Sequence, residues 1–261
     1  MRPAFSVLAL LLAMAACVLP GQATQPAPEL NPITIETAVA GTAQAAAEQT
    51  AAAQPALPGK TGTALEQGED GTKYIDYDAG FEVTFPIGWL AVRPGSEEFE
   101  AALKKQGATN QGLHDQMQSD LAGETEANPH RLFAYILRPD LQKNAMLGFS
   151  ALAWDPQTAQ PLDSAVMGEV VRGLEAPGGI PGFHADTAQI HEELPVNVME
   201  IGGRWTLSDA DGTVAMYATT LFFKPEPTSG VRITFSFVEQ YRTQISADVK
   251  FILESLRIVT P

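Results

Sequence analysis

Four histidines are the residues of this chain best suited to bind a metal ion, and they are His114, His130, His184 and His191. Zinc ligands typically lie four residues apart on a helix or come with pairs of cysteines, and the spacing here fits neither pattern. His191 is followed by Glu192 and Glu193, so suitable ligand atoms are present there without the rest of a motif. The sequence therefore predicts no metal centre, and histidines in contact with solvent are the simpler interpretation.

Two aspartates and a glycine resemble the beginning of a calcium-binding loop, and they are Asp209, Asp211 and Gly212. An EF-hand loop needs a further oxygen ligand and a glutamate at its twelfth position, which is Thr220 in this chain. Because Thr220 carries no carboxylate, we interpret the segment from Asp209 to Gly212 as a short hairpin turn between two strands.

Residues for covalent or acid–base catalysis do not form a recognisable motif. The chain has no Gly-x-Ser-x-Gly nucleophile elbow, and its one cysteine, Cys17, lies close to the N-terminus. The glycine-rich segment 178–182 lacks the strand and helix of a phosphate-binding motif. Paired carboxylates need a cleft that shifts their pKa, and the pairs here are typical of an acidic surface: Glu97 with Glu98, Glu124 with Glu126, and Glu192 with Glu193. We therefore predict no catalytic residue, no cofactor and no enzyme.

One tryptophan and the glycine-rich loop 176–183 are candidates for contact with a partner protein. Trp89, Trp154 and Trp205 all lie on or beside predicted strands, where packing in the core is the simpler interpretation. Trp205 precedes the turn at Asp209, and it is the one that we expect to be exposed. The possible partner surface consists of Trp205, Gly178, Gly179 and Gly182.

The segments that would position these residues follow strand and helix patterns. Phe81, Val83 and Phe85 alternate with polar residues, which is the period of a half-buried strand. Further strands are predicted at 89–92, 131–138, 147–154, 188–191, 196–201, 204–208, 213–223 and 231–237. Helices are predicted at 96–106, where Gly107 should end the helix, and at 113–121, 162–174 and 241–256.

The strand predicted at 131–138 has large apolar residues on both faces, because Leu132 and Ile136 point one way and Phe133 and Tyr135 the other. Such a strand must be covered on both sides. Successive hairpins with helices between them indicate a largely antiparallel sheet. We therefore predict an α+β fold in which helices cover both faces of that sheet, an α/β/α sandwich.

Residues 1–17 are typical of a secretory signal peptide. Arg2 is followed by an apolar run from Phe5 to Ala16, which is too short to span a bilayer. The run ends in Met14-Ala15-Ala16-Cys17, which resembles the bacterial lipobox, whose cysteine is lipidated. We predict lipidation of Cys17 and attachment to the extracytoplasmic side of the cell membrane. The alternative is ordinary cleavage near Ala23, which would release a secreted protein.

Residues 18–71 have the composition of a disordered tether, and residues 72–261 that of one globular domain. No aromatic residue occurs between Thr24 and Gly71, where Ala, Thr, Gln and Pro dominate, so this stretch cannot bury enough apolar surface to fold. No later stretch is apolar for long enough to predict a transmembrane helix. The net charge of −15 argues against a nucleic-acid partner, because phosphate binding needs clustered Lys and Arg.

The segment Gly80-Phe81-Glu82-Val83-Thr84-Phe85-Pro86-Ile87-Gly88-Trp89 resembles the entry motif of the PsbP and Mog-type sandwich proteins, in which a Gly-Phe strand runs into Pro-x-x-Trp. The last helix, with Phe251-Ile252-Leu253-Glu254-Ser255-Leu256, is similar to the final helix of that superfamily. The resemblance covers both ends of the domain. It implies an α/β/α sandwich that binds or assembles without catalysis, and it assigns no functional residue, because the matching residues are expected to be structural.

These patterns together predict a membrane-anchored extracytoplasmic lipoprotein that acts as a non-catalytic binding or assembly module for a protein partner at the cell envelope. The alternatives are a carboxylate-based hydrolase that acts on envelope material, and a carrier that delivers a small molecule or ion to a membrane partner. Converging buried carboxylates or histidines in a cleft would favour the hydrolase, and a closed apolar pocket would favour the carrier. A flat exposed apolar patch would favour the protein binder.

Overall fold

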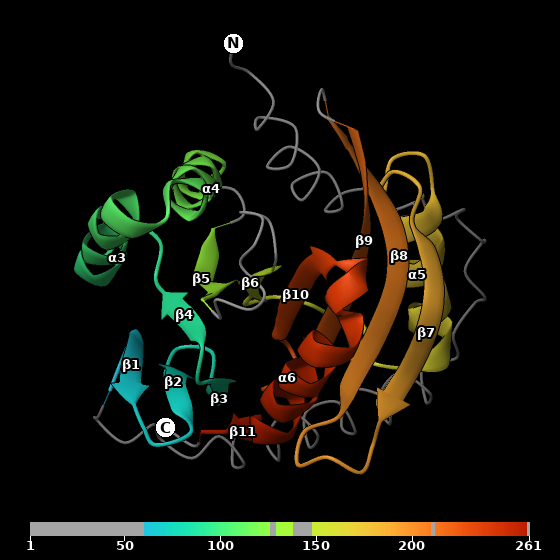
Figure 1. Ribbon diagram of the computed structural model, residues 1–261. Helices are drawn as coiled ribbons and strands as arrows, with labels where there is room; N and C mark the ends of the chain where they lie inside the picture. Colours follow the sequence, from blue (N-terminus) through green and yellow to red (C-terminus); the bar gives the residue numbers. More distant parts are fainter. Residues whose placement is uncertain (1–59, 126–128, 138–147, 210–211, 260–261) are drawn as a thin grey trace, which may run out of the picture. The chain divides into compact units, whose positions relative to one another are not determined.

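Two antiparallel sheets form the body of the protein in the computed structural model, which describes residues 60–125, 129–137, 148–209 and 212–259 (Figure 1). The small sheet has four strands in the order β1 (Thr63–Gln67), β2 (Gly71–Asp76), β3 (Phe81–Pro86) and β11 (Arg257–Ile258). The large sheet has seven strands in the order β4 (Trp89–Val92), β5 (His130–Ile136), β6 (Gly148–Asp155), β10 (Gly230–Val238), β9 (Gly212–Phe223), β8 (Val198–Asp209) and β7 (His184–His191).

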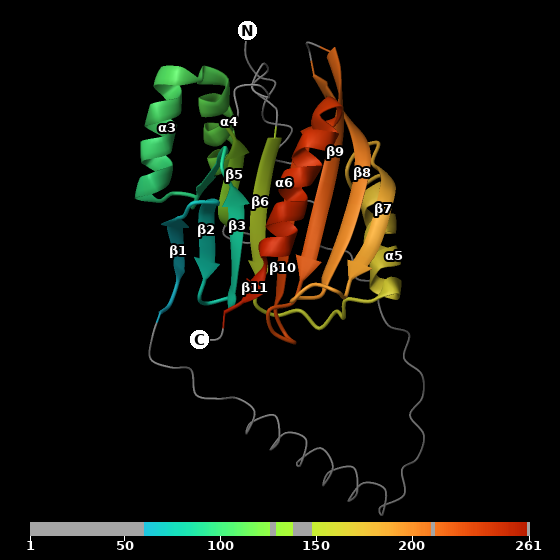
Figure 2. The same cartoon turned by 60° about the horizontal axis from the view of Figure 1, so that its bottom comes forward.

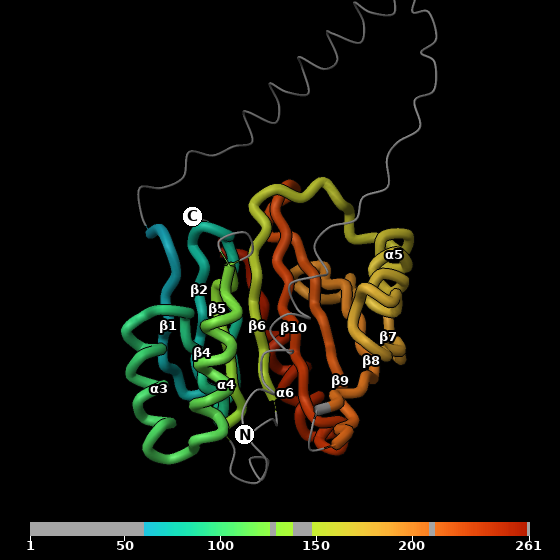
Figure 3. Tube along the Cα trace, turned by 90° about the horizontal axis from the view of Figure 1, so that it is seen from above, coloured from blue at the N-terminus to red at the C-terminus, as the bar shows by residue number. Residues whose placement is uncertain are grey.

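The small sheet and the helices cover the two faces of the large sheet. The helices of the described residues are α3 (Glu97–Thr109), α4 (Gln111–Ala122), α5 (Ser164–Glu175), the 3₁₀ turn η2 (Glu239–Tyr241) and α6 (Arg242–Ser255). The small sheet and α6 lie over one face, called the inner face, and α3, α4 and α5 lie over the outer face (Figure 2, Figure 3). This arrangement confirms the predicted α+β fold with a largely antiparallel sheet covered on both faces.

The main hydrophobic core lies between the inner face of the large sheet, the small sheet and α6. Alternate residues of β3 and β10 and one stripe of α6 enter it, as their periodicity predicted. The Trp89 ring lies 6.0 Å from the rings of Phe85 and Phe235, so the Pro-x-x-Trp segment joins the two sheets through an aromatic contact. The residues that these three elements contribute include Phe81, Val83, Phe85, Ile233, Phe235, Phe237, Ile245, Val249 and Ile252.

Strand β5 contributes to the core on both of its faces, as predicted. Leu132 and Ile136 belong to the main core, whereas Phe133 and Tyr135 pack with Phe99 and other side chains of α3 and α4 on the outer face. On the inner side, the small sheet is part of the cover. Two-sided burial requires a second layer, but it does not specify whether that layer is a sheet or a helix.

Several predicted boundaries were wrong, and β7, for example, begins at His184 and not at residue 188. Strand β1 at 63–67 pairs with β2 inside the predicted tether 18–71, so the folded domain begins before residue 72. Strand β8 runs through Gly202 and Gly203 without a break, because both glycines give room to neighbouring strands and side chains. Helix α3 continues past Gly107 to Thr109, since a glycine inside a helix costs only about 1 kcal/mol relative to alanine.

The predicted membrane-targeting features are all N-terminal. The signal peptide at 1–17, with Cys17, and tether residues 18–59 lie outside the described residues. Among residues that the structure describes, no helix combines the length and the apolar composition needed to cross a membrane. The lipid anchor therefore stays a prediction.

Strand β7 forms one edge of the large sheet, and this edge is partly closed. The register between β7 and β8 shifts between Ala185 and Thr187, which is a β-bulge. The backbone N–H of Ala185 donates a hydrogen bond of 2.9 Å to Oε1 of Glu175, the last residue of α5. Both features hinder the pairing of a further strand with β7.

A buried carboxylate ties the two sheets together. Asp76, at the end of β2, is fully buried and accepts hydrogen bonds of 2.8 Å from the Tyr74 hydroxyl and 2.9 Å from the Ala79 N–H. Arg131 of β5 donates to both carboxylate oxygens of Asp76, from Nε at 2.9 Å and from Nη2 at 2.8 Å, and also to Asp78 at 2.9 Å. Burial and the neighbouring Asp76 raise the pKa of Tyr74, so the Tyr74 hydroxyl keeps the proton that it donates.

Replacing Arg131 with methionine should lower the free energy of unfolding by about 3 kcal/mol, because it leaves the Asp76 carboxylate buried without its cation. Chemical denaturation of the full chain measures this change. Lys250→Met is a suitable control, because the Lys250–Glu254 pair is largely exposed and such pairs contribute about 0.5 kcal/mol or less. A loss below about 1 kcal/mol for Arg131→Met would contradict the role given to this ion pair.

Candidate binding groove

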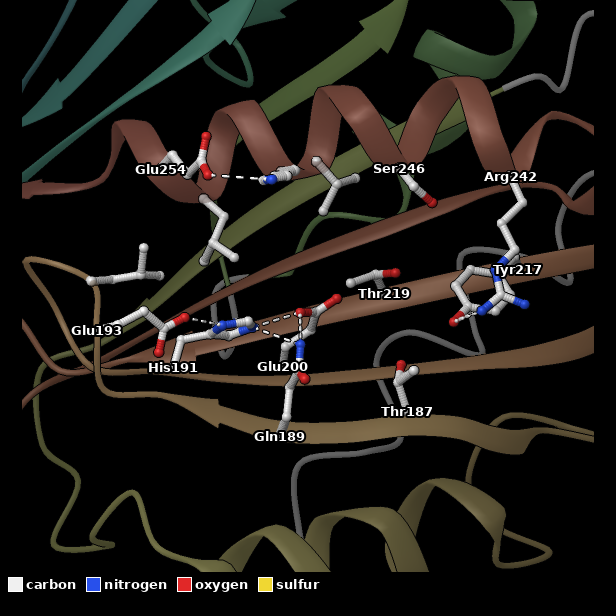
Figure 4. Close-up of a pocket in the computed structure, with 14 residues that line it drawn as sticks. Thr187, Gln189, His191, Glu193, Glu200, Tyr217, Thr219, Arg242, Ser246 and Glu254 are labelled. Atoms are coloured by element: carbon white, nitrogen blue, oxygen red, sulfur yellow. Dashed lines mark hydrogen bonds and ion pairs between the residues drawn. The ribbon is translucent and has the colours of Figure 1, made fainter.

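An open groove lies between α6 and the inner face of strands β7, β8 and β9 (Figure 4). It encloses about 290 Å³, which is close to the lower end of the volumes of ligand sites. Most side chains along its rim are exposed, and those on its floor are half-buried or buried. The side chains that carry its chemistry are Gln189, His191, Glu200, Tyr217, Thr219 and Arg242.

The groove forms because the inner face of the large sheet changes from apolar to polar towards the β7 edge. On β8, Val198 is buried in the main core, and Glu200, which faces the same way two residues further on, lines the groove. On β9, Leu221 is buried in the core and Thr219 lines the groove. Every inward-facing residue of β7 from Thr187 onwards is polar, so β7 offers α6 no apolar side chain to pack against, and the space between them stays open as the groove.

His191 lies between two carboxylates at one end of the groove (Figure 4). Its Nε2 is 2.7 Å from Oε2 of Glu200, and its Nδ1 is 2.9 Å from Oε1 of Glu193. Gln189 Nε2 donates a hydrogen bond of 3.0 Å to the same Oε2 of Glu200. Partial burial lowers the pKa of His191, but the hydrogen bonds with Glu200 and Glu193 outweigh it, so the pKa lies above its ordinary value of 6.5.

Arg242 closes the other end of the groove. Its guanidinium carbon lies 3.9 Å from the centre of the Tyr217 ring, and its Nη2 donates to the Tyr217 hydroxyl at 2.9 Å. Its Nη1 donates to Asp186 at 3.1 Å, and Asp186 also accepts a hydrogen bond from Arg204 at 2.9 Å. Gly202 permits this stack, because a Cβ at that position would lie 2.5 Å from the Tyr217 hydroxyl oxygen.

This arrangement is better suited to binding than to catalysis. A histidine acts as a general base only when one ring nitrogen offers a free lone pair to the substrate, and both ring nitrogens of His191 contact carboxylates.

Outside the groove, on α3, the hydrogen bond from Arg93 lowers the pKa of Glu98 to about 2, so Glu98 is ionised near neutral pH and cannot act as an acid. No group of three or more metal-ligating side chains gathers within the described ranges.

A second group of titratable side chains joins α4 to β5 on the outer face. Asp120 accepts hydrogen bonds from the Tyr135 hydroxyl at 2.9 Å and from the Gln116 amide at 2.6 Å. Burial raises the pKa of Asp120 to about 7, although the hydrogen bonds from Tyr135 and Gln116 act in the opposite direction. Close by, His130 Nδ1 lies 2.5 Å from Oε1 of Glu124.

Trp205 is buried, contrary to the exposure that we expected. Its side chain is 7% exposed and packs with Phe183, Met199 and Met216 on the outer face of the large sheet. Helix α5 covers that part of the outer face, which the position of Trp205 next to a turn could not reveal. The indole N–H of Trp205 has no hydrogen-bond partner in the described part of the chain.

The predicted glycine loop ends α5 and leads the chain into β7. The N–H of Gly179 donates to the carbonyl of Ala176 at 2.8 Å, and a Cβ on Gly179 would lie 2.3 Å from the carbonyl oxygen of Gly173. Gly182 has a φ of +70°, and Gly178 has open space around it. The loop residues Ile180 and Phe183 share one hydrophobic cluster with Trp205, so the structure brings the two predicted features together. A partner surface at these glycines stays a prediction.

The histidines are paired more often than the sequence indicated. The side chains of His130 and His191 are only 17% and 16% exposed and contact carboxylates, so the solvated interpretation was wrong for both. His114 contacts Gln111 and Asp115, and His184 is 74% exposed beside Glu175. The hairpin predicted around residue 210 is confirmed, because Asp209 pairs with Gly212 at the end of the β8–β9 ladder.

Sequence reasoning missed the groove because its main residues come from four separate segments. Glu200 and Thr219 are polar residues inside otherwise apolar strands, and this was a usable signal for an inward-facing polar site. Arg242 gave no such signal, because an arginine at the first turn of an amphipathic helix is ordinary. Only the pairing of β7, β8 and β9 shows that these side chains share one face.

In the folded chain, His191 should titrate above pH 6.5, and Glu200→Gln should move its pKa down. The stabilisation from the charged pair is complete below the unfolded-state pKa and is lost as the pH rises through the higher folded-state pKa. NMR titration of the imidazole resonances measures both values, and Glu254→Gln on the facing helix should leave them unchanged. Titration of His191 below pH 6.5 would contradict the arrangement.

Asp120→Asn should raise the free energy of unfolding at pH 8 by about 1–2 kcal/mol and change it little at pH 4. The Asp120 carboxyl binds its proton more tightly in the folded chain, with a pKa of about 7 instead of 3.8. The contribution of Asp120 to the free energy of unfolding therefore falls as the pH rises between these two values. Urea denaturation across this pH range tests the prediction. Parallel pH profiles for the wild type and the variant would refute it.

No protein-family model and no curated protein matches the chain. Among solved structures, the cyanobacterial PsbP of Synechocystis sp. PCC 6803 is 10% identical, with a TM-score of 0.42, covering 78% of this chain and 97% of its own. LpqN, involved in cell envelope biogenesis of Mycobacterium tuberculosis, is 12% identical, with a TM-score of 0.41 and coverages of 78% and 100%. The Ran-binding protein Mog1p of Saccharomyces cerevisiae is 7% identical, with a TM-score of 0.39 and coverages of 77% and 97%. Two of these three structures, PsbP and Mog1p, are of the protein types that the entry segment Gly80–Trp89 resembles.

Proposed function

We propose that this chain is a membrane-anchored extracytoplasmic lipoprotein whose folded domain binds a protein partner at the cell envelope without catalysing a reaction. The observation that carries the proposal is the groove between α6 and strands β7 to β9. It is concave, both polar and apolar side chains line it, and its charged groups are already held in place by their neighbours. Binding therefore orders few side chains of the domain.

The exposed rim of the groove supports a protein partner over a free small molecule. Sites for small ligands bury most of the ligand surface, and this groove is open along its length. A partner protein brings its own surface to cover the rim residues and to exclude water from the floor. The carrier alternative needs a closed apolar pocket, which this groove does not provide.

Within the groove, the feature that bears on the hydrolase alternative is the approach of Glu193 and Glu200 to His191. Both carboxylates contact the imidazole and favour its protonated form, because they raise its pKa. A general base needs a ring nitrogen that is free to face the substrate, and these contacts occupy both nitrogens of His191. The geometry therefore supports binding.

The anchor is proposed from the sequence. Cys17 follows an apolar leader directly, and the first strand of the described residues begins at Thr63, so a long segment of sequence separates the lipidation site from that strand. A tether of that length would let the groove reach partners at a distance from the membrane surface.

Crosslinking and capture from membranes test the partner. Ser246 is exposed on the face of α6 that lines the groove, and Ser246→Trp should fill it. Gln118→Trp, exposed on α4 at the outer face, is the matched control. We expect a protein that is recovered with the wild type and with Gln118→Trp, and recovered at least about tenfold less with Ser246→Trp. Equal recovery with all three chains would contradict the proposal.

Labelling of the wild type and of Cys17→Ala with a fatty-acid probe in cells tests the anchor. The label should be present on the wild type and absent from Cys17→Ala. An unlabelled, released protein that begins after Ala23 would instead establish ordinary cleavage, and the partner would then be sought among secreted components.

A further inference from the structure

We infer that the groove holds a basic side chain of the partner, a lysine or an arginine, with its charged group on the carboxylate of Glu200. This inference rests on the proposed function, because it names the chemistry by which the groove would recognise the partner.

Glu200 has one engaged and one open carboxylate oxygen. Its Oε2 receives hydrogen bonds within the His191 cluster, from His191 at 2.7 Å and from Gln189 at 3.0 Å. No described residue donates a hydrogen bond to its Oε1, which points away from His191 into the groove on the side of Thr219 (Figure 4). The Glu200 side chain is only 20% exposed, so this oxygen has lost part of its hydration. A cationic donor would form a charge-assisted hydrogen bond there.

The charge balance at this end of the groove also favours a cation. Glu193 and Glu200 carry two negative charges, and His191 carries at most one positive charge, so this end of the groove is negative in either protonation state of the ring. Across the groove, Lys250 and Glu254 of α6 pair with each other at 3.7 Å and contribute no net charge. At the far end, Arg242 repels a second cation, so only the Glu200 end attracts one.

The wall of the groove suits the aliphatic part of a long basic side chain. Val249 and Leu253 of α6 and Leu194 of the loop after β7 line the same groove as Glu200. Lysine and arginine carry methylene groups that pack on apolar surface while the charged head meets a polar group. The volume of about 290 Å³ equals roughly ten water molecules, which is enough for one such side chain.

NMR titration of the isotopically labelled full chain tests the inference with two probes of nearly equal shape. Nα-acetyl-L-arginine amide carries the cation, and Nα-acetyl-L-citrulline amide replaces the guanidinium with a neutral urea. We expect the arginine probe to shift the amide resonances of His191, Glu200 and Val249 saturably, and to bind about tenfold more tightly than the citrulline probe.

Glu200→Gln removes the charge with little change of shape and should weaken binding of the arginine probe by about tenfold. Glu254→Gln is the matched control, because Glu254 pairs with Lys250 on the far wall, and it should weaken binding less than about twofold. Equal affinity for the two probes, or saturable shifts confined to other surfaces, would overturn the inference.

Two outcomes separate this inference from the proposed function. In the first, a protein is captured whose recovery is lost with Ser246→Trp and kept with Glu200→Gln. The partner-binding function is then supported, and the role of Glu200 is overturned. Binding of the arginine probe that depends on Glu200, without any captured protein, refutes a protein partner and therefore also this inference, leaving a site for free cations.

Discussion

The rest of the fold depends on one buried ion pair between its two sheets, Asp76 with Arg131. The carboxylate has no exposed surface, so it is tolerated only while the arginine and its other donors surround it. This requirement fixes the end of β2 against β5 at one relative position. Helix α6 packs beside β3 in the same layer as the small sheet, and the place of α6 over the large sheet follows from that position.

The groove is a consequence of this layering. The small sheet and α6 together cover the inner face from β4 to β9, and the large sheet extends beyond them to β7. Where the apolar cover ends, the inward-facing residues become polar and pair with one another, as His191 and Arg242 do with their neighbours. Polar groups that are bound to each other at the end of a core cost little stability, and their outer sides stay available to a partner.

Most elements followed from local patterns, because alternation in β3 and β10 and the four-residue spacing in α6 report burial directly. In the structure, the side chains of Ser96 and Asp163 cap the starts of α3 and α5. The groove and the burial of Trp205 depend on which strands pair and which face a helix covers, and residues far apart in sequence decide both. Edge strand β1 was missed because backbone pairing, with little apolar burial, holds it in place.

The bulge and the Glu175 contact at the β7 edge have a consequence for how copies of this protein coexist. Molecules concentrated on a surface meet at high local density, where an open strand edge would template growing fibrils of the chain. The bulge at Asp186 and the occupied N–H of Ala185 interrupt such a template at the edge that also borders the groove. These two features therefore oppose the addition of a strand from a second copy at this edge of the sheet.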